Sequence, residues 1–232
     1  MPKLFAISDL HLSFSANKPM NVFGSRWDDY EKRLFENWQS VVSEDDVVLM
    51  PGDTSWATYV RDAAKDFDFI NRLNGTKLIS KGNHDYWWET LSKLGGFLDA
   101  NHFHTIRFIH NTYFQCGDVV ICGTKGYPET EKEPESADEK KLYNRELQRL
   151  ENAILEAKKT GAARTFVMLH YPPETDTAFA RCLKEHAVDF CVFGHLHGNA
   201  YASATQGNVG GVEYRLVSCD YLKFMPLEIG SF

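Results

Sequence analysis

Lys77-Leu78-Ile79-Ser80-Lys81-Gly82-Asn83-His84-Asp85 is the stretch that decides the fold of this chain. The apolar run at its start predicts a buried strand, so residues 82–85 fall on the loop at the carboxyl end of that strand. An amide, an imidazole and a carboxylate on one tight loop are costly unless a charged ligand lies between them. Alone, the tetrapeptide is more typical of a polar turn than of a functional site. Its meaning depends on four other loops.

Each of these four loops places an aspartate or a histidine directly after an apolar run. They are Asp9-Leu10-His11, Gly52-Asp53, His170 and Gly194-His195-Leu196-His197. Carboxylate and amide oxygens together with imidazole nitrogens are suited to divalent ions such as manganese, iron or zinc. A lone histidine or aspartate in such a loop would usually be structural. Seven such groups gathered without a metal would leave charges and donors unmatched, so the five loops together predict a metal site.

The order Asp-x-His, Gly-Asp, Gly-Asn-His-Asp, His and Gly-His-x-His resembles that of the calcineurin-like metallophosphoesterases, over positions 9 to 197. The resemblance implies an α/β fold, specifically a four-layer αββα sandwich of two mixed β-sheets flanked by helices. It also implies two divalent metal ions, with Mn, Fe or Zn as the expected elements. Transferred by position, the ligands are Asp9, His11 and His197 for the first ion, Asn83, His170 and His195 for the second, and Asp53 as the bridge.

His84 and Asp85 are the catalytic candidates by the same resemblance. His84 would lie close to the phosphate and protonate the leaving oxygen or stabilise charge in the transition state. Asp85 would orient His84 or a ligand imidazole. In several branches of the family a polar residue three positions after the bridging aspartate orients this histidine, but Trp56 stands there. The resemblance therefore leaves open what orients His84, and it points away from the protein Ser/Thr phosphatases.

Several aromatic residues adjoin these motifs or the segment 124–161. They are Trp56, Tyr86, Trp87, Trp88, Tyr127 and Tyr171. Most are expected to pack between helices and sheet, whereas some could form a rim that stacks a nucleobase or an aryl leaving group. Tyr86 and Tyr171 are the candidates for substrate binding.

The first eighty residues read as βαβαβ, which predicts parallel strands with right-handed crossovers and ligands at their carboxyl ends. Helices are predicted over 27–42, 58–73 and 87–94, the last of which ends at Gly95-Gly96. The runs 106–116 and 119–123 predict a hairpin around Gly117-Asp118.

Residues 127–141 read as a solvated loop before a helix whose inward positions run from Leu142 to Ala157. A helix over 178–186 and closing antiparallel strands within 207–217 and 227–229 complete the pattern. We expect residues 1–232 to form a single domain, in which the segment 124–161 is either a cap over the cleft or ordinary packing.

The composition is that of an ordinary soluble protein, with 43% hydrophobic and 25% charged residues. We expect no membrane span, because no apolar stretch approaches the roughly 20 residues that a bilayer requires. A strand-like amino end and five cysteines without a Cys-x-x-Cys pattern favour a cytoplasmic location. The net charge of −7 argues against a broad nucleic-acid surface, although bound cations would still admit phosphates. The oligomeric state is unknown from the sequence.

The resemblance implies a phosphatase or phosphodiesterase. It would cleave a phosphomonoester or phosphodiester of a small phosphorylated substrate, nucleotide-like ones included, by attack of a metal-bound hydroxide. One alternative is a pyrophosphatase that splits a nucleotide-linked lipid or sugar, to which the acidic segment 129–139 gives little support. An alternative of another class is a non-catalytic metal-binding scaffold, which the complete ligand set opposes.

Overall fold

The computed structural model describes residues 1–128 and 136–232 of the chain. Strands and helices alternate in its first half, where η marks a short 3₁₀-helix. The elements up to residue 116 are β1 (Lys3–Ala6), η1 (Met20–Phe23), η2 (Ser25–Trp27), α1 (Tyr30–Val41), β2 (Val47–Met50), η3 (Val60–Ala63), α2 (Ala64–Asn71), β3 (Thr76–Ile79), α3 (Leu91–Ala100), β4 (Ile106–Phe108) and β5 (Tyr113–Cys116). The elements after residue 116 are β6 (Val119–Thr124), α4 (Ala137–Lys158), β7 (Arg164–Leu169), α5 (Ala178–Glu185), β8 (Phe190–Phe193), η4 (Gly198–Ser203), β9 (Gly207–Val209), β10 (Val212–Leu216) and β11 (Leu227–Ser231).

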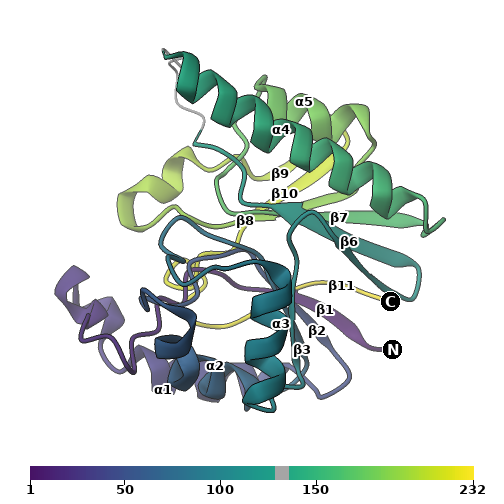
Figure 1. The fold of residues 1–232 in the computed structure, drawn as a ribbon. Coiled ribbons are helices and arrows are strands. Elements are labelled where there is room, and N and C mark those ends of the chain that lie inside the picture. Colours follow the sequence, from purple (N-terminus) through teal and green to yellow (C-terminus); the bar gives the residue numbers. More distant parts are fainter. Residues whose placement is uncertain (129–135) are drawn as a thin grey trace.

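These strands form two facing sheets with helices on both outer sides (Figure 1). The five-stranded sheet has the order β11-β1-β2-β3-β4, and the six-stranded sheet has the order β5-β6-β7-β8-β10-β9. Helices α1, α2 and α3 cover the first sheet, whereas α4 and α5 cover the second (Figure 1). The predicted αββα sandwich of two mixed sheets is confirmed.

The side chains of β1 illustrate how the layers are built. Leu4 and Ala6 belong to the core between the two sheets, whereas Phe5 belongs to the core beneath the helices of the first sheet. Because a strand between two layers buries both of its faces, it reads as a continuous apolar run in the sequence. This is the property that made the central strands recognisable.

The sheets place all the motif loops at one edge. Strands β1 to β4 run parallel to one another, as do β6, β7, β8 and β10, while β11, β5 and β9 are antiparallel to their neighbours. The two sheets are joined at their carboxyl ends, where the Ser8 amide donates to the Val217 carbonyl at 2.8 Å and the Cys219 amide donates to the Ser8 carbonyl at 2.9 Å. The loops after β1 and β10 therefore lie side by side.

Two of the predicted elements in the first half were wrong in their boundaries or pairing. The helix predicted over 87–94 begins at Leu91, because the Thr90 side chain caps it by accepting from the Lys93 amide, and it continues through Gly95-Gly96 to Ala100. The run 106–116 is not one arm of a hairpin, since β4 pairs with β3 in the first sheet and β5 pairs with β6 in the second. The chain passes from the first sheet to the second between β4 and β5, which divides the predicted strand into two.

The segment 124–161 contributes mainly a layer of the fold. Helix α4 starts at Ala137, inside the predicted loop, because Ser136 and Glu139 form a reciprocal capping box. Leu150 and Ile154 of α4 pack in the core over the second sheet, whereas Leu142, expected to point inward, is 41% exposed. The part of the predicted loop over 129–135 lies outside the described residues.

Two further properties concern the helices and the cysteines. Among the described residues, no helix combines the length and the apolar character that crossing a membrane requires. All five cysteines are buried and free of disulfide bonds.

Candidate metal centre

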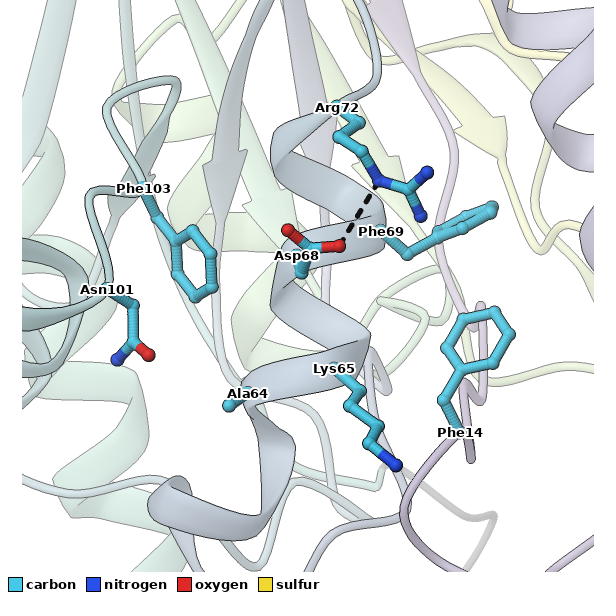
Figure 2. Close-up of a pocket in the computed structure, with 8 residues that line it drawn as sticks. All are labelled: Phe14, Ala64, Lys65, Asp68, Phe69, Arg72, Asn101 and Phe103. Carbon is cyan, nitrogen blue, oxygen red and sulfur yellow. Dashed lines mark ion pairs between the residues drawn. The ribbon is translucent and has the colours of Figure 1, made fainter.

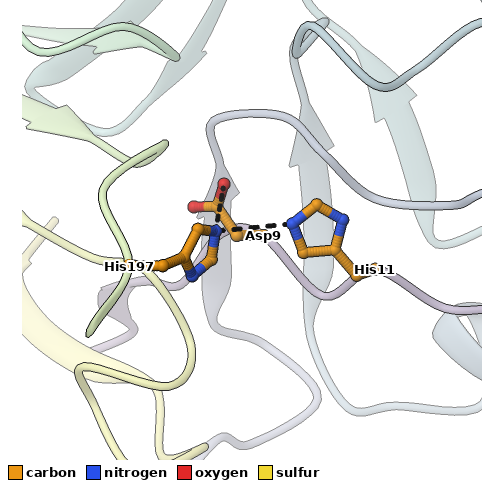
Figure 3. Close-up of side chains that lie close together, drawn as sticks. All are labelled: Asp9, His11 and His197. Atoms are coloured by element: carbon orange, nitrogen blue, oxygen red, sulfur yellow. Dashed lines mark hydrogen bonds and ion pairs between the residues drawn. The ribbon is translucent and has the colours of Figure 1, made fainter. Parts of the chain in front are cut away.

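The first group of predicted ligands lies at the ends of β1 and β8. Figure 3 shows interactions from the His197 ring to both Asp9 and His11. Its Nε2 atom lies 3.4 Å from His11 Nε2 and 3.6 Å from Asp9 Oδ1. Asp9 and His11 are buried, and His197 is half-buried. The three side chains thus point their ligand atoms at one small volume.

The second group combines the ends of β3, β7 and β8. Asn83 Oδ1 lies 2.6 Å from His170 Nε2 and 2.9 Å from His195 Nδ1. The other ring nitrogen of His170, Nδ1, donates to the Pro51 carbonyl at 3.0 Å. That hydrogen bond leaves His170 Nε2 with its lone pair directed at the site.

Asp53, at the end of β2, lies between the two groups. Its Oδ2 atom is 3.9 Å from His11 Nε2 and 3.5 Å from His170 Nε2. Ligand atoms of Asp9, Asp53 and His170 lie within 4.8 Å of one another, as do those of Asp9, His11 and His197. The structure therefore brings all seven predicted ligands together, with Asp53 between the two groups.

The spacing of these atoms fits bound cations. Two donors that each lie about 2.1 Å from one ion are separated from each other by roughly 3.0–3.4 Å. The 3.4 Å between His11 Nε2 and His197 Nε2 corresponds to such a pair. In the absence of a cation, the same two nitrogens lie within hydrogen-bonding distance of each other.

The charges of the site also fit cations. Burial lowers the pKa of His11 to about 3 and that of His170 to about 4, so both imidazoles are neutral at pH 7 and keep a free lone pair. Burial and the neighbouring Asp85 and Asp9 charges raise the pKa of Asp53 to about 9. In the absence of a cation Asp53 therefore keeps its proton at pH 7, and divalent cations beside the neutral His11 and His170 would favour its carboxylate form.

The backbone is strained where it presents these ligands. Asp9, His11, Asp53 and His195 have φ values of 58°, 47°, 50° and 72°, in the left-handed region that residues other than glycine rarely occupy. Such strain persists only where the surrounding structure enforces it, and it is concentrated at functional sites.

Two glycines allow the loops to approach one another closely. A Cβ atom at Gly82 would collide with the carboxylate and the amide nitrogen of Asp53, and one at Gly194 would collide with the Asp9 carboxylate and the Ser8 hydroxyl. There is therefore a steric reason for glycine at the positions directly before Asn83 and His195.

Asp85 has partners that differ from those expected. Its two buried oxygens accept hydrogen bonds from the amides of Asp53, Thr54 and Gly82 at 2.9, 2.9 and 2.7 Å, from Trp87 Nε1 at 3.0 Å and, at 3.4 Å, from the Ser55 amide. These bonds connect the loop after β2 to the loop after β3. Because its oxygens are occupied by these donors, Asp85 holds the ligand loops in place and orients no imidazole through the hydrogen bonds described.

His84 is packed against tryptophan. Its ring centroid lies 4.6 Å from that of Trp56, and its Nδ1 atom is buried without a hydrogen-bond partner among the described residues. Trp56 also stacks on His11, with centroids 4.9 Å apart and ring planes at 22°. The tryptophan thus supports both imidazoles by ring packing at the position where a polar residue was expected.

Asp220, just beyond β10, is a site residue that sequence reasoning missed. Its Oδ1 atom accepts from His197 Nδ1 at 2.8 Å, and its Oδ2 atom accepts from the Tyr201 hydroxyl. Burial opposes protonation of His197, but the hydrogen bonds to Asp220 and Asp9 outweigh it and raise the pKa of His197 to about 10. A carboxylate shortly after the strand-like residues Leu216 and Val217 was the available signal, because it repeats the pattern of the other loops.

A cavity of about 540 Å³ opens over this centre. Its polar lining includes His11, Asp53, His84, His195, His197 and Asp220, and Met20, Phe23, Arg26, Trp27, Trp56 and Gly198 complete it. Neither Tyr86 nor Tyr171 is among the lining residues that the structure describes. Tyr86 is 60% exposed beside His84, and the Tyr171 ring lies 4.6 Å from that of His195.

A second hollow runs along α2 (Figure 2). Its one lining carboxylate, Asp68 among the described residues, forms an ion pair with Arg72 at 3.2 Å. Its lining includes no histidine within the described ranges. The groups suited to bind metal ions therefore line the cavity over Asp53 and not this hollow.

A family model of the calcineurin-like phosphoesterases matches residues 2–199. The chain belongs to the calcineurin-like phosphoesterase family. The match includes all seven predicted ligands and His84, whereas Asp220 lies beyond it. Family membership together with the ligand clusters supports a metal-dependent phosphoesterase, a hydrolase that acts on phosphate esters.

Similar proteins add little beyond the fold. The uncharacterized protein MJ1445 of Methanocaldococcus jannaschii is 31% identical over 94 residues, which are 38% of this chain and 50% of that protein. The chain thus spans about half the length of this curated relative. A protein of unknown function from Aquifex aeolicus, AQ665, has a TM-score of 0.54 at 15% identity and covers 98% of this chain and 96% of its own. The protein TT1561 of Thermus thermophilus has a TM-score of 0.54 at 15% identity, over 84% of this chain and 82% of its own.

The role of Asp85 predicts a loss of stability on its removal. In Asp85→Asn, an amide replaces a carboxylate that accepts from four amides and an indole, so the free energy of unfolding should fall by about 2–4 kcal/mol. Urea denaturation in the presence of a chelator measures this change. Asp45→Asn, at an exposed acid, is the matched control and should stay within about 0.5 kcal/mol of the wild type. Equal stability of the two variants would contradict the assigned role.

The role of Asp220 predicts a change in metal affinity. Asp220→Asn keeps the shape of the side chain but removes the charge beside His197, so the affinity for Mn²⁺ should fall about 10–100-fold in calorimetric titration. Tyr201→Phe, which leaves the carboxylate in place, should have a smaller effect. An unchanged affinity in Asp220→Asn would show that Asp220 does not support the ligand.

Proposed function

We propose that this chain is a phosphohydrolase that cleaves a phosphomonoester or a phosphodiester at a centre of two divalent cations. The observation that carries the proposal is the position of Asp53 between two groups of ligands. In the proposal, Asp9, His11 and His197 hold one cation, Asn83, His170 and His195 hold the other, and Asp53 contacts both. Mn, Fe and Zn suit this mixed set of oxygen and nitrogen donors.

When bound, two such cations polarise the phosphate and activate water as the nucleophile. The chain itself positions the reacting groups. His84 lines the cavity with its ring centroid 5.7 Å from that of His11, so it can donate a hydrogen bond to a phosphate oxygen or to the leaving oxygen. Packing on Trp56 holds the ring there. The His84 amide donates to Asp53 Oδ1 at 2.8 Å, so the position of His84 is tied to that of the shared ligand.

A second candidate is a pyrophosphatase for a nucleotide-linked compound. The observation that favours it is the combination of apolar residues with Arg26 in the cavity wall, which would suit a substrate with an organic group and a second phosphate. A non-catalytic scaffold is disfavoured by the complete ligand set. The five buried, unpaired cysteines support a cytoplasmic location, and the core shared by the two sheets supports one domain over residues 1–232.

The proposal predicts metal-dependent hydrolysis that requires Asp53. Protein stripped with a chelator and reloaded with Mn²⁺ should hydrolyse bis-p-nitrophenyl phosphate or p-nitrophenyl phosphate, and the preferred ester decides between phosphodiesterase and phosphatase. Asp53→Asn should lower turnover by about 100-fold or more, because loss of a shared ligand should cost at least as much as loss of a supporting residue. Asp45→Asn serves as the control. If the wild type neither binds Mn²⁺ nor hydrolyses either ester, the proposed function is wrong.

A further inference from the structure

The cavity over the metal centre is lined by two chemically different kinds of side chain. One kind is the polar ligand residues, and the other is the apolar side chains Met20, Phe23, Trp27 and Trp56. Met20, Phe23 and Trp27 come from one short segment, 20–27, which contains η1 and η2. We call these four side chains the apolar wall.

The apolar wall begins directly at the metal ligands. Trp56 stacks on His11, and the Trp27 ring lies 6.0 Å from that of His197 and 6.3 Å from that of His11. A phosphate bound at the ligands would therefore direct the remainder of its ester along this wall. Phe23, at the outer end, is 61% exposed although its side chain has no polar atom.

The apolar wall is held in place before any substrate arrives. Trp27 packs edge-to-face on Tyr30 and Phe224, with centroid distances of 5.1 and 5.3 Å. Arg26 Nη1 lies 3.6 Å from Asp220 Oδ2, so the segment is also tied to the carboxylate that supports His197. Gly24, with a φ of 117°, makes the turn between η1 and η2 in a conformation that other residues rarely adopt. A preformed surface loses little conformational freedom on binding.

We propose that the apolar wall binds the leaving group of the substrate and selects a planar aromatic group, either a simple aryl group or a nucleobase. This inference rests on the proposed function. An exposed phenyl ring that lines the same cavity as two tryptophan rings offers faces and edges on which a flat ring can pack, whichever alcohol carries it. A volume of about 540 Å³ accommodates a group of that size. Phe23 is then a specificity-determining residue that takes no part in the chemistry.

The first test is direct binding to protein loaded with Mn²⁺. Calorimetry should give a tighter dissociation constant for phenylphosphonate than for methylphosphonate, neither of which carries an ester bond to be cleaved. In Phe23→Ala this ratio should fall about tenfold, because the ring contact is lost. Val22→Ala is the matched control. The Val22 side chain is next to Phe23 in the sequence and 71% exposed, but it is not among the cavity-lining residues that the structure describes, so the ratio of dissociation constants should not change.

Further ligand pairs and kinetics identify the aromatic group. Preference for adenosine 5′-monophosphate over ribose 5-phosphate would support a nucleobase, and preference within the phosphonate pair alone would support a simple aryl group. With p-nitrophenyl phosphate, Phe23→Ala should raise KM and leave kcat unchanged, because contacts remote from the phosphate are made equally in ground and transition states.

The outcomes separate the two proposals. Phosphonate binding that depends on Phe23, without hydrolysis of any ester, would retain the apolar wall and contradict the proposed function. Ester hydrolysis with equal affinity for the two phosphonates would contradict binding of aromatic groups by the apolar wall and leave the proposed function standing. The same conclusion would follow if Phe23→Ala left the ratio of the two dissociation constants unchanged.

Discussion

Two buried carboxylates at the ends of neighbouring parallel strands are the constraint on which this structure depends. Ligand oxygens of Asp9 and Asp53 lie within 4.8 Å of each other, and both side chains are almost fully buried. Two negative charges so close together and so far from water are costly unless cations or donors compensate them. The His195 amide donates to both oxygens of Asp9 at 3.1 Å, and the His84 amide donates to Asp53 at 2.8 Å. Glycines at 82 and 194 allow those amides to come near enough. The neutral imidazoles of His11 and His170 add nitrogen donors that suit divalent cations.

Other buried carboxylates support this centre without facing it. Asp85 ties the loop after β2 to the loop after β3, and Asp220 connects His197 to Arg26 of the cavity wall. Asp66 on α2 accepts from the Phe14 amide at 2.8 Å and from the Ser55 hydroxyl, so it fixes the loops after β1 and β2 from the helix side. The site is therefore rigid because helices, sheet ends and loops are all hydrogen-bonded to the same few acids.

The sequence predicted the sandwich and the gathering of the ligands because both depend on local patterns. Each of Asp9, Asp53, Asn83, His170 and His195 follows within four residues of a strand, and parallel strands present such loops at one edge. Asp220 and Phe23 were missed because their proximity to the site arises from contacts between distant parts of the chain. Asp220 reaches His197 only because the Ser8 and Val217 backbones join the two sheets. The hairpin around Gly117-Asp118 forms between β5 and β6, but its first arm is shorter than expected for a similar reason. Residues 106–108 form β4 of the other sheet, and that placement depends on pairing with β3.

The most direct test of the account is the number and position of the cations. In a crystal soaked with Mn²⁺, anomalous scattering should give two peaks on either side of the Asp53 carboxylate, about 3.5–4 Å apart. One peak should adjoin Asp9, His11 and His197, and the other should adjoin Asn83, His170 and His195. A single peak, or peaks away from Asp53, would contradict a shared carboxylate between two metal sites.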